Sequence, residues 1–557
     1  MSKQVRTLII VGAGILVLVA LLLVLLLTPA LGGGSTSSSA SADNSSTVDT
    51  SVSLLDKSKD ADGKNVENPV KKAVVKTGDE EYTVAPNKDG QLTVQAYQDL
   101  PVNTTAIDSL VQTLATITAT RKITDDPDLL TGESAAAQQQ ASDSSSAAAV
   151  GGDAAFGLDK PLSTVTVTYH DDTIAVFELG NLEPMETGYY FRESGKKPVY
   201  LVDTTFAGTL QLKSTAYIGT TLYAGPTVKE GDSPGQVVVR DLDLTGSIRK
   251  DQPVSIVLTS QTADAEKYQY SSHLITKPYK RTVSASTDMT TLFSSFSSLT
   301  AGEALVPHPT KADLTKYGFG DPLSVAVFRL AVSTTKSSLA AANNSSSSAG
   351  TSSGTSEDDD KEVIYGTEEH TVTIGGKNDD GNYYVMVNGI DVIYLVSSAG
   401  LSWAEVRYND LVNPGMFLES IDNIDSIAFT IDGKTTTFKL EHVEGYESGS
   451  DEELNITAGG KKYSTSEFRG LYQVLMGLQR YGDADAKPTG SPALIIDVVP
   501  LKGKADRVTA SLYKTSASSY TCVHADGDSY KVRGSTIENV VRQFENYLAG
   551  KPVSTDY

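Results

Sequence analysis

The sequence predicts an α+β fold in which amphipathic helices pack on mostly antiparallel sheets, and it predicts this arrangement three times. Five apolar residues at helical spacing occur as Ile107, Leu110, Val111, Leu114 and Ile117, as Met289, Leu292, Phe293, Phe296 and Leu299, and as Phe468, Leu471, Tyr472, Leu475 and Leu478. Each stripe is followed by a proline that opens a strand-like run, and each run by two tyrosines ten residues apart. This recurrence indicates three copies of one module. The nearest partner for each stripe is the module's own sheet.

The tyrosine pairs mark the predicted hairpins. In a hairpin with an odd loop centred on Gly195, Gly389 or Ala525, the two tyrosines face each other and stabilise the sheet by about 0.2–1 kcal/mol. A two-residue turn at Asn388-Gly389 would instead pair Tyr383 with Tyr394. The sequence leaves both registers open. These tyrosines are first of all sheet residues, and they also form the candidate ligand or partner surface: Tyr189, Tyr190, Tyr200, Tyr383, Tyr384, Tyr394, Tyr520 and Tyr530.

The N-terminus carries a membrane signal. Lys3 and Arg6 precede an apolar run from Leu8 to Leu27, whose 20 residues span about 30 Å of hydrocarbon. The flanking charges place the N-terminus in the cytoplasm and the rest of the chain outside it. A cleaved signal peptide is the alternative, but its apolar region would be about 7–15 residues. We therefore expect a single-pass cell-membrane protein, with residues 1–30 as cytoplasmic start and transmembrane helix, in contact with the bilayer through Leu8–Leu27.

Composition shifts divide the remainder of the chain. A segment rich in Ser, Gly, Ala, Asp and Asn is typical of a flexible stalk, and two tracts of similar composition interrupt the modules as disordered insertions. The expected parts are the stalk (31–66), module 1 (67–226, insertion 131–154), module 2 (235–414, insertion 333–362) and module 3 (415–557).

Local patterns predict the elements of each module in order. Module 1 opens with a hairpin over 70–84, and Asn103 to Thr105 offer caps for its helix. Module 2 opens with the strands "VVVRDLDL" and "VSIVLTS", and its helix begins near Ser286 or Thr287. In module 3 apolar residues alternate up to an Asp432-Gly433 turn and back, which predicts a hairpin. The last helix is expected over Ser535 to Leu548.

Residue types that carry chemistry are scattered. The six histidines show no metal-ligand spacing, and we expect them to be solvated. The Gly-x-Ser-x-Gly at Gly350 lies within a Ser/Gly insertion, where a nucleophile elbow cannot form. The acidic clusters at Asn378–Gly381 and at Asp241 and Asp243 are expected to be solvated turns. We therefore predict no catalytic, cofactor-binding or metal residues, no cofactor and no enzymatic activity.

Charge and cysteine content limit the partners. The net charge of −23 argues against nucleic acid, because neutralising phosphates requires clustered Lys and Arg. Cys522 is the only cysteine, so the chain has no intramolecular disulfide and must be held together by packing.

Several segments resemble a known family. The joins "DLTKYGFGDPLSVAVF" and "FGLDKPLSTVTV", with the hairpins "GYYFRESGKKPVYLVD" and "GNYYVMVNGIDVIYLVS", look like the bacterial envelope family catalogued as domain of unknown function 4340. The resemblance covers modules 1 and 2 well and module 3 loosely, since "TGSPALIIDVV" and "SYKVRG" depart from its Gly-Leu-x-x-Pro and Tyr-Leu-Val motifs. It implies an extracytoplasmic protein whose relatives are often encoded beside gliding-motility-type ABC transporters. It carries over no catalytic residues.

These observations favour a non-enzymatic, membrane-anchored repeat protein that binds a protein or envelope polymer, as an accessory of an ABC transporter or another envelope protein. The alternative is a module that binds cell-wall glycan through exposed hairpin tyrosines. A third hypothesis, an envelope hydrolase, predicts a deep pocket with two or more carboxylates of shifted pKa. A specific site is expected where one module departs from the others or where two modules meet.

Overall fold

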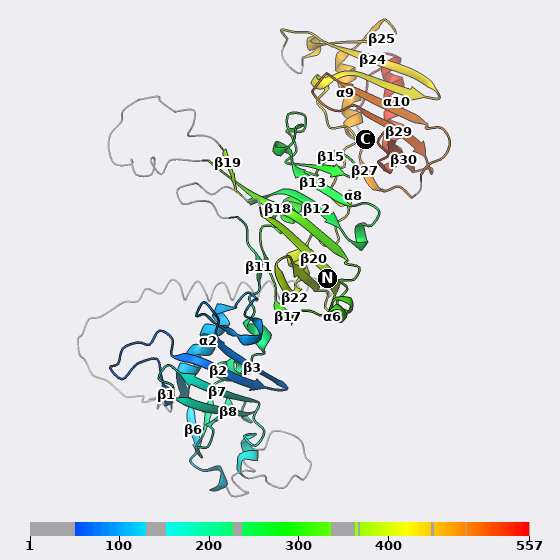
Figure 1. Ribbon diagram of the computed structural model, residues 1–557. Helices are drawn as coiled ribbons and strands as arrows, with labels where there is room; N and C mark the ends of the chain where they lie inside the picture. Colours follow the sequence, from blue (N-terminus) through cyan, green and yellow to red (C-terminus); the bar gives the residue numbers. More distant parts are fainter. Residues whose placement is uncertain are drawn as a thin grey trace, which may run out of the picture. The chain divides into compact units, whose positions relative to one another are not determined.

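The computed structural model describes residues 51–129, 152–226, 237–335, 362–365, 368–446, 450–485 and 487–555 (Figure 1). Residues 51–557 form one compact unit, distinct from residues 1–50. The transmembrane segment Leu8–Leu27 and most of both insertions lie outside the described residues. Within the described residues no helix is long and apolar enough to cross a membrane.

Three antiparallel sheets confirm the predicted α+β class and the repetition. The sheet of module 1 has the strand order β4-β3-β2-β7-β8-β9-β10-β6. Its strands are β2 (Val70–Thr77), β3 (Glu80–Pro86), β4 (Leu92–Val94), β6 (Arg121–Thr124), β7 (Ser163–Tyr169), β8 (Ile174–Leu182), β9 (Tyr189–Glu193) and β10 (Val199–Val202). Its α-helices are α2 (Thr104–Ala115) and α4 (Thr204–Leu210).

The sheet of module 2 has the order β15-β14-β13-β12-β18-β20-β21-β22-β17, with β19 also paired to β18. Its strands are β12 (Val237–Thr245), β13 (Val254–Leu258), β14 (His273–Lys277), β15 (Arg281–Thr282), β17 (Glu303–Pro307), β18 (Ser324–Thr335), β19 (Glu362–Tyr365), β20 (Glu369–Lys377), β21 (Tyr383–Val387) and β22 (Ile390–Val396). Its α-helices are α5 (Thr287–Ser294), α6 (Lys311–Lys316) and α8 (Tyr408–Leu411).

The sheet of module 3 repeats this order as β26-β25-β24-β23-β28-β29-β30-β31-β27. Its strands are β23 (Ile424–Ile431), β24 (Lys434–His442), β25 (Leu454–Ala458), β26 (Lys461–Tyr463), β27 (Arg480–Asp483), β28 (Leu494–Pro500), β29 (Val508–Lys514), β30 (Ser519–His524) and β31 (Ser529–Arg533). Helices α9 (Thr465–Met476) and α10 (Gly534–Leu548) pack on each other and on this sheet. In all three modules the first strand of the large sheet after the helix, β6, β17 or β27, lies at the edge opposite the last strand before the helix.

The predicted apolar stripes are buried, but the helices end before the fifth position of each. In α2, Ile107, Leu110 and Leu114 are buried in the core of module 1. Ile117 is buried as well, yet it lies in β5 (Thr116–Ala119). Leu299 lies likewise in β16 (Leu299–Thr300). The helices stop here because the chain turns into an extended segment that pairs with another strand.

That pairing recurs between successive modules. The end of module 1, β11 (Thr221–Tyr223), pairs antiparallel with β16. The end of module 2 bonds in the same place just after α9, where the Arg480 N–H donates to the carbonyl of Pro414 at 2.9 Å. In module 1 the equivalent position beside β5 is occupied by β1 (Val52–Asp56). The stalk expected over 31–66 is therefore wrong for β1, because Leu54 and Leu55 pack against the core of module 1.

The edges of the predicted insertions are also ordered. A 3-10 turn, η3 (Gly152–Phe156), begins inside the insertion expected over 131–154, and its Phe156 is fully buried. Strand β18 continues to Thr335 and β19 begins at Glu362, inside the insertion expected over 333–362. Chain at these edges is fixed because it either pairs as strand or buries a large side chain.

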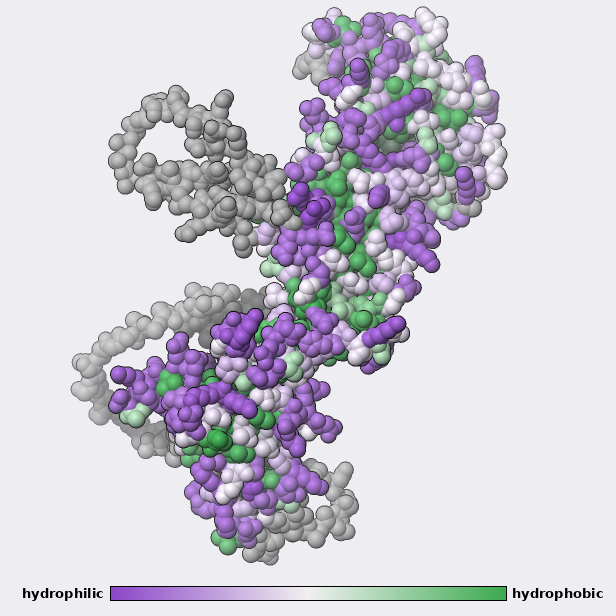
Figure 2. All heavy atoms as spheres, viewed as in Figure 1, coloured by the Kyte–Doolittle hydropathy of each residue, from purple (hydrophilic) through white to green (hydrophobic). Residues whose placement is uncertain are grey.

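The exterior of the described residues is mostly polar. In Figure 2 hydrophilic and hydrophobic residues are interspersed on the face shown, with several hydrophobic patches over module 2. The most exposed large apolar side chains are Leu129, Ile174 and Met185. Single exposed apolar residues of this kind are ordinary on soluble surfaces.

Candidate binding site between modules 2 and 3

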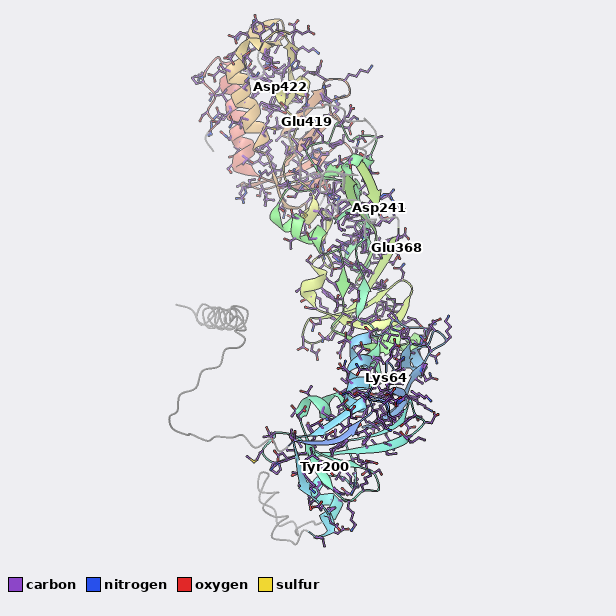
Figure 3. All side chains as sticks on the ribbon, turned by 90° about the vertical axis from the view of Figure 1, so that its left-hand side faces the viewer. Lys64, Tyr200, Asp241, Glu368, Glu419 and Asp422 are labelled. Atoms are coloured by element: carbon purple, nitrogen blue, oxygen red, sulfur yellow. The ribbon has the colours of Figure 1, made fainter. Side chains whose placement is uncertain are left out.

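Most of the hairpin tyrosines are core residues. Tyr190, Tyr383, Tyr394, Tyr520 and Tyr530 are buried, with exposed fractions of 0–6%. The other three, Tyr189, Tyr200 and Tyr384, are half-buried; Figure 3 labels Tyr200. The structure distributes these eight side chains over three sheets, and the five buried ones have no surface to offer a ligand.

Neither predicted hairpin register occurs. Tyr190 lies opposite Leu201, and Tyr384 lies opposite Leu395. The Asn388-Gly389 turn is present, because Val387 pairs with Ile390, but a bulge then moves Tyr394 opposite Val385. In module 3 Tyr530 pairs with Cys522. In module 2 the irregular pairing of β21 with β22 shifts the register, and nothing in the alternation of the sequence announces it. In modules 1 and 3 the hairpin strands pair without a shift, so the turn alone sets the offset.

Two other expectations need correction. His273, His370 and His524 are buried rather than solvated. Asp241 lies in β12 (Figure 3), where it accepts hydrogen bonds from Arg329, and is not part of a turn. The Asn378 cluster does form a turn, since the Asn378 side chain accepts hydrogen bonds from the backbone of Asp380 and Asn382. Among the described residues no group of three or more His, Cys, Asp or Glu could hold a metal ion.

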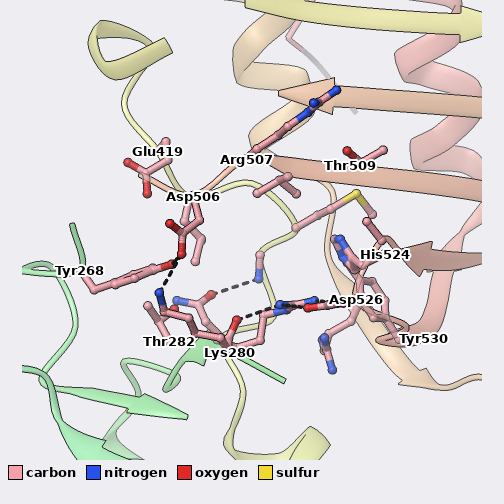
Figure 4. Close-up of a pocket in the computed structure, with 18 of the residues that line it drawn as sticks. Tyr268, Lys280, Thr282, Glu419, Asp506, Arg507, Thr509, His524, Asp526 and Tyr530 are labelled. Carbon is pink, nitrogen blue, oxygen red and sulfur yellow. Dashed lines mark hydrogen bonds and ion pairs between the residues drawn. The ribbon is translucent and has the colours of Figure 1, made fainter. Parts of the chain in front are cut away.

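A cavity of about 240 Å³ lies where residues of modules 2 and 3 meet (Figure 4). Module 2 contributes Tyr268 and Tyr270 from the loop before β14, Lys280, and the short edge strand β15 that follows it. Module 3 contributes the segment Gly415–Glu419, residues 506–507 before β29 with the first two residues of β29, and the turn between β30 and β31. The cavity thus exists only through the contact of two sheets.

The charges across this contact are divided by module. Lys267 and Lys280 of module 2 each lie 2.8 Å from an oxygen of Asp506. Arg281, also in module 2, lies 2.8 Å from Asp526 and 3.0 Å from Asp528. In these pairs module 2 supplies the cations and module 3 the carboxylates, so the two faces attract each other.

Asp528 is the most buried of these carboxylates, with 1% of its surface exposed. Its Oδ2 accepts hydrogen bonds from Arg480 at 2.7 Å and from the hydroxyl of Tyr408 at 3.0 Å, in addition to the Arg281 contact. Arg480 also stacks on the Tyr530 ring, 4.1 Å from its centroid. A buried carboxylate with three donors from two modules is well compensated.

Electrostatics hold most cavity groups in one charge state near neutral pH. Burial opposes ionisation of Asp506, but hydrogen bonds from Lys267, Lys280 and Tyr268 outweigh it and lower its pKa. The pKa of Asp526 is lowered in the same way by Arg281, against the effect of burial. Such groups do not exchange protons readily at neutral pH, where general acid–base catalysis requires a matched pKa.

Two cavity groups differ in this respect. Burial, together with the nearby Arg281, lowers the pKa of His524 to about 4, so its ring is neutral at pH 7. Burial raises the pKa of Glu419, and the hydrogen bond from Tyr270 opposes this only partly. Glu419 is therefore the cavity carboxyl with the greatest tendency to carry a proton.

No motif in the sequence indicates the residues of this cavity. The charged residues that line it are spread from Lys280 to Asp526 and follow no motif spacing. The only relevant expectation was positional, that a specific site would lie where two modules meet. Naming the residues required knowing which loops of the two sheets come together.

The chain belongs to the family of domain of unknown function 4340, whose model matches it over residues 93–322 and 275–481. The first match begins just before α2 and the second just before α5. The repetition seen in the sheets is thus also present in the family match. No curated protein and no solved structure matches the chain.

Proposed function

We propose that this chain is a non-enzymatic, single-pass membrane protein whose three modules stand outside the cytoplasm as a binding or accessory component of a cell-envelope system, with an ABC transporter as the expected partner. The observation that carries this proposal is the junction cavity, where almost every ionised group is engaged with a fixed partner. Paired groups of this kind serve recognition and orientation better than proton transfer. The apolar run Leu8–Leu27 supports the anchor.

Single-cysteine labelling tests the topology. The native Cys522 is fully buried and its pKa is raised to about 12 by burial, so it contributes little background. Ser2→Cys and the exposed Lys88→Cys would each be treated with a membrane-impermeant maleimide. We expect Lys88→Cys to react in intact cells and Ser2→Cys only after lysis. Equal protection of both cysteines in intact cells would contradict the extracytoplasmic assignment.

In-cell crosslinking followed by mass spectrometry tests the partner. We expect crosslinks from module surfaces to a transporter subunit or another envelope protein. Recovery of the intact protein from membranes without any transporter peptide, in repeated experiments, would count against the accessory role while leaving the topology untouched.

A hydrolase is the second candidate, and one observation favours it. The cavity holds Glu419, whose pKa burial raises, together with Asp506, whose pKa is lowered. Carboxyls with pKa values moved apart are the usual acid and base of a hydrolase. Against this, Asp506 accepts hydrogen bonds from two lysines and Tyr268, which leaves it poorly placed to activate a water. Release of reducing ends from envelope glycan that Glu419→Gln abolishes would support the hydrolase.

A further inference from the structure

We propose that the junction cavity binds an uncharged, hydroxyl-rich ligand, a short stretch of saccharide. This inference rests on the proposed binding function and adds the class of ligand. Its starting point is the cavity of about 240 Å³ with walls from both modules.

The ion pairs disfavour a charged ligand. An anion would have to take Arg281 from Asp526 and Asp528, or Lys280 from Asp506. A cation would have to take the carboxylates of the same pairs from their basic partners. Either exchange leaves a partly or fully buried charge without its partner, which is strongly unfavourable. The cavity therefore selects for ligands without net charge.

The wall of the cavity contains an uncharged polar group, the Thr282 hydroxyl, that lacks a hydrogen-bond partner among the described residues. Thr282 is only 3% exposed, and its hydroxyl makes no hydrogen bond to any part of the chain that the structure describes. Its carbonyl accepts from the backbone N–H of Asn413 at 2.9 Å, which fixes its position. A buried hydroxyl without a partner is unfavourable. The oxygen itself is closed to solvent, so a ligand hydroxyl can satisfy it only if the side chains over it shift, and a trapped water is the competing occupant.

The face of a sugar ring is apolar and requires an apolar surface, which two tyrosines provide. The rings of Tyr268 and Tyr270 lie 6.3 Å apart, and their hydroxyls are held by Asp506 and Glu419. The Tyr270 side chain remains 47% exposed, so a ligand can reach it. Met416 and Leu418 extend this wall. Rings fixed at their hydroxyl ends lose little freedom on binding.

Calorimetric titration of the full chain in detergent tests the proposal. The neutral probes are the β-1,4-linked tetramers of glucose and of N-acetylglucosamine, and the charged probe is a tetramer of galacturonic acid. We expect a neutral tetramer to bind with an affinity that changes less than about twofold between low and high salt, because no ion pair forms. The galacturonate should bind at least tenfold more weakly.

Variants locate the binding. Tyr270→Ala and Thr282→Val should each weaken the neutral tetramer at least tenfold, whereas Thr282→Ser should retain it. Tyr446→Ala, at an equally exposed tyrosine remote from the cavity, is the matched control. Circular dichroism of each variant confirms folding.

Three results would overturn the proposal: no binding of either neutral tetramer at millimolar concentration, tighter binding of galacturonate, or equal losses in Tyr446→Ala. If the cysteine labelling and crosslinking succeed while these titrations fail, only the ligand class is wrong. If the labelling fails, the proposed function itself is wrong.

Discussion

Arg249 shows what one buried cation does in this fold. It is 3% exposed and donates to the carbonyls of Trp403 at 2.8 Å and Ala404 at 3.1 Å, and to the Ser324 hydroxyl at 2.7 Å. Burial, with Arg407 nearby, lowers its pKa to about 10, so it stays charged at neutral pH. The guanidinium ties the β12–β13 connection to the segment after β22.

Arg249→Met should therefore destabilise the protein by about 2–4 kcal/mol, because several carbonyls lose a charged donor inside the core. Urea unfolding of the full chain in detergent measures this change. Arg507→Met removes an arginine whose side chain is 64% exposed, and should leave the unfolding midpoint nearly unchanged, because solvent screens its ion pair. An unchanged unfolding midpoint for Arg249→Met would show that these hydrogen bonds do not stabilise the fold.

His524 gives the protein a defined sensitivity to acid. Its folded pKa of about 4 lies below the unfolded value of about 6.5, so the unfolded chain binds the proton first. Above about pH 6.5 the titration of His524 does not change the free energy of unfolding. As the pH decreases toward 4, this free energy falls by about 3 kcal/mol, and below pH 4 His524 causes no further loss. The groups facing the ring are Arg281, Arg480, Asp526, Asp528 and the Tyr530 hydroxyl.

Replacing His524 by glutamine removes the group that titrates and keeps a hydrogen-bond donor for the Tyr530 hydroxyl. Between pH 7 and pH 4 the native protein should lose about 3 kcal/mol more unfolding free energy than His524→Gln. Denaturant unfolding at a series of pH values gives the comparison. Parallel curves for the two proteins would show that His524 does not titrate as its burial requires.

At the scale of elements, the contact between β15 and the β30–β31 turn depends on Asp528. Asp528→Asn leaves Arg281 and Arg480 without their shared carboxylate and should weaken the junction by about 3–5 kcal/mol. Hydrogen exchange should accelerate at β15 and at Gly415–Glu419 while β23 to β25 stay protected. Asp425→Asn, which affects Lys439 within module 3 away from the cavity lining, is the control. Unchanged exchange at β15 would mean that packing alone holds the modules.

The edge strand β1 is the second element whose contribution can be measured. It pairs with β5, and Leu54 and Leu55 pack against the core of module 1. Replacing both leucines by serine should cost about 1–3 kcal/mol, because apolar area is returned to water. Hydrogen exchange should then rise in β5 and α2 and not in module 3, and Ser53→Ala should change neither. Faster exchange in module 3 would show that the modules do not respond separately.

At the scale of the whole molecule, the modules repeat one strand order but differ in the segment that pairs beside the chain after the helix. Strand β1 occupies in module 1 the place that the preceding module's end occupies in modules 2 and 3. The C-terminal segment packs back on its own module, where the Val553 N–H donates to Glu467 and Val553 contacts Gly470 of α9.

The local elements and their repetition could be predicted from the residue pattern. Helical spacing identified α2, α5 and α9, and the alternation around Asp432-Gly433 identified the β23–β24 hairpin, because these patterns reflect one face turned to a core. It also indicated the family, through the joins between helix and strand.

The tertiary structure alone decided the strand order, the tyrosine registers and the junction. The register shift between β21 and β22 moved Tyr394, and β1 pairs with residues 60 to 67 positions away in the chain. The cavity joins Lys280 to Asp506 and Arg281 to Asp528, contacts between residues more than two hundred positions apart. Periodicity records which side of an element is buried and carries no information about which distant loop it meets, so these features could emerge only from the packed sheets.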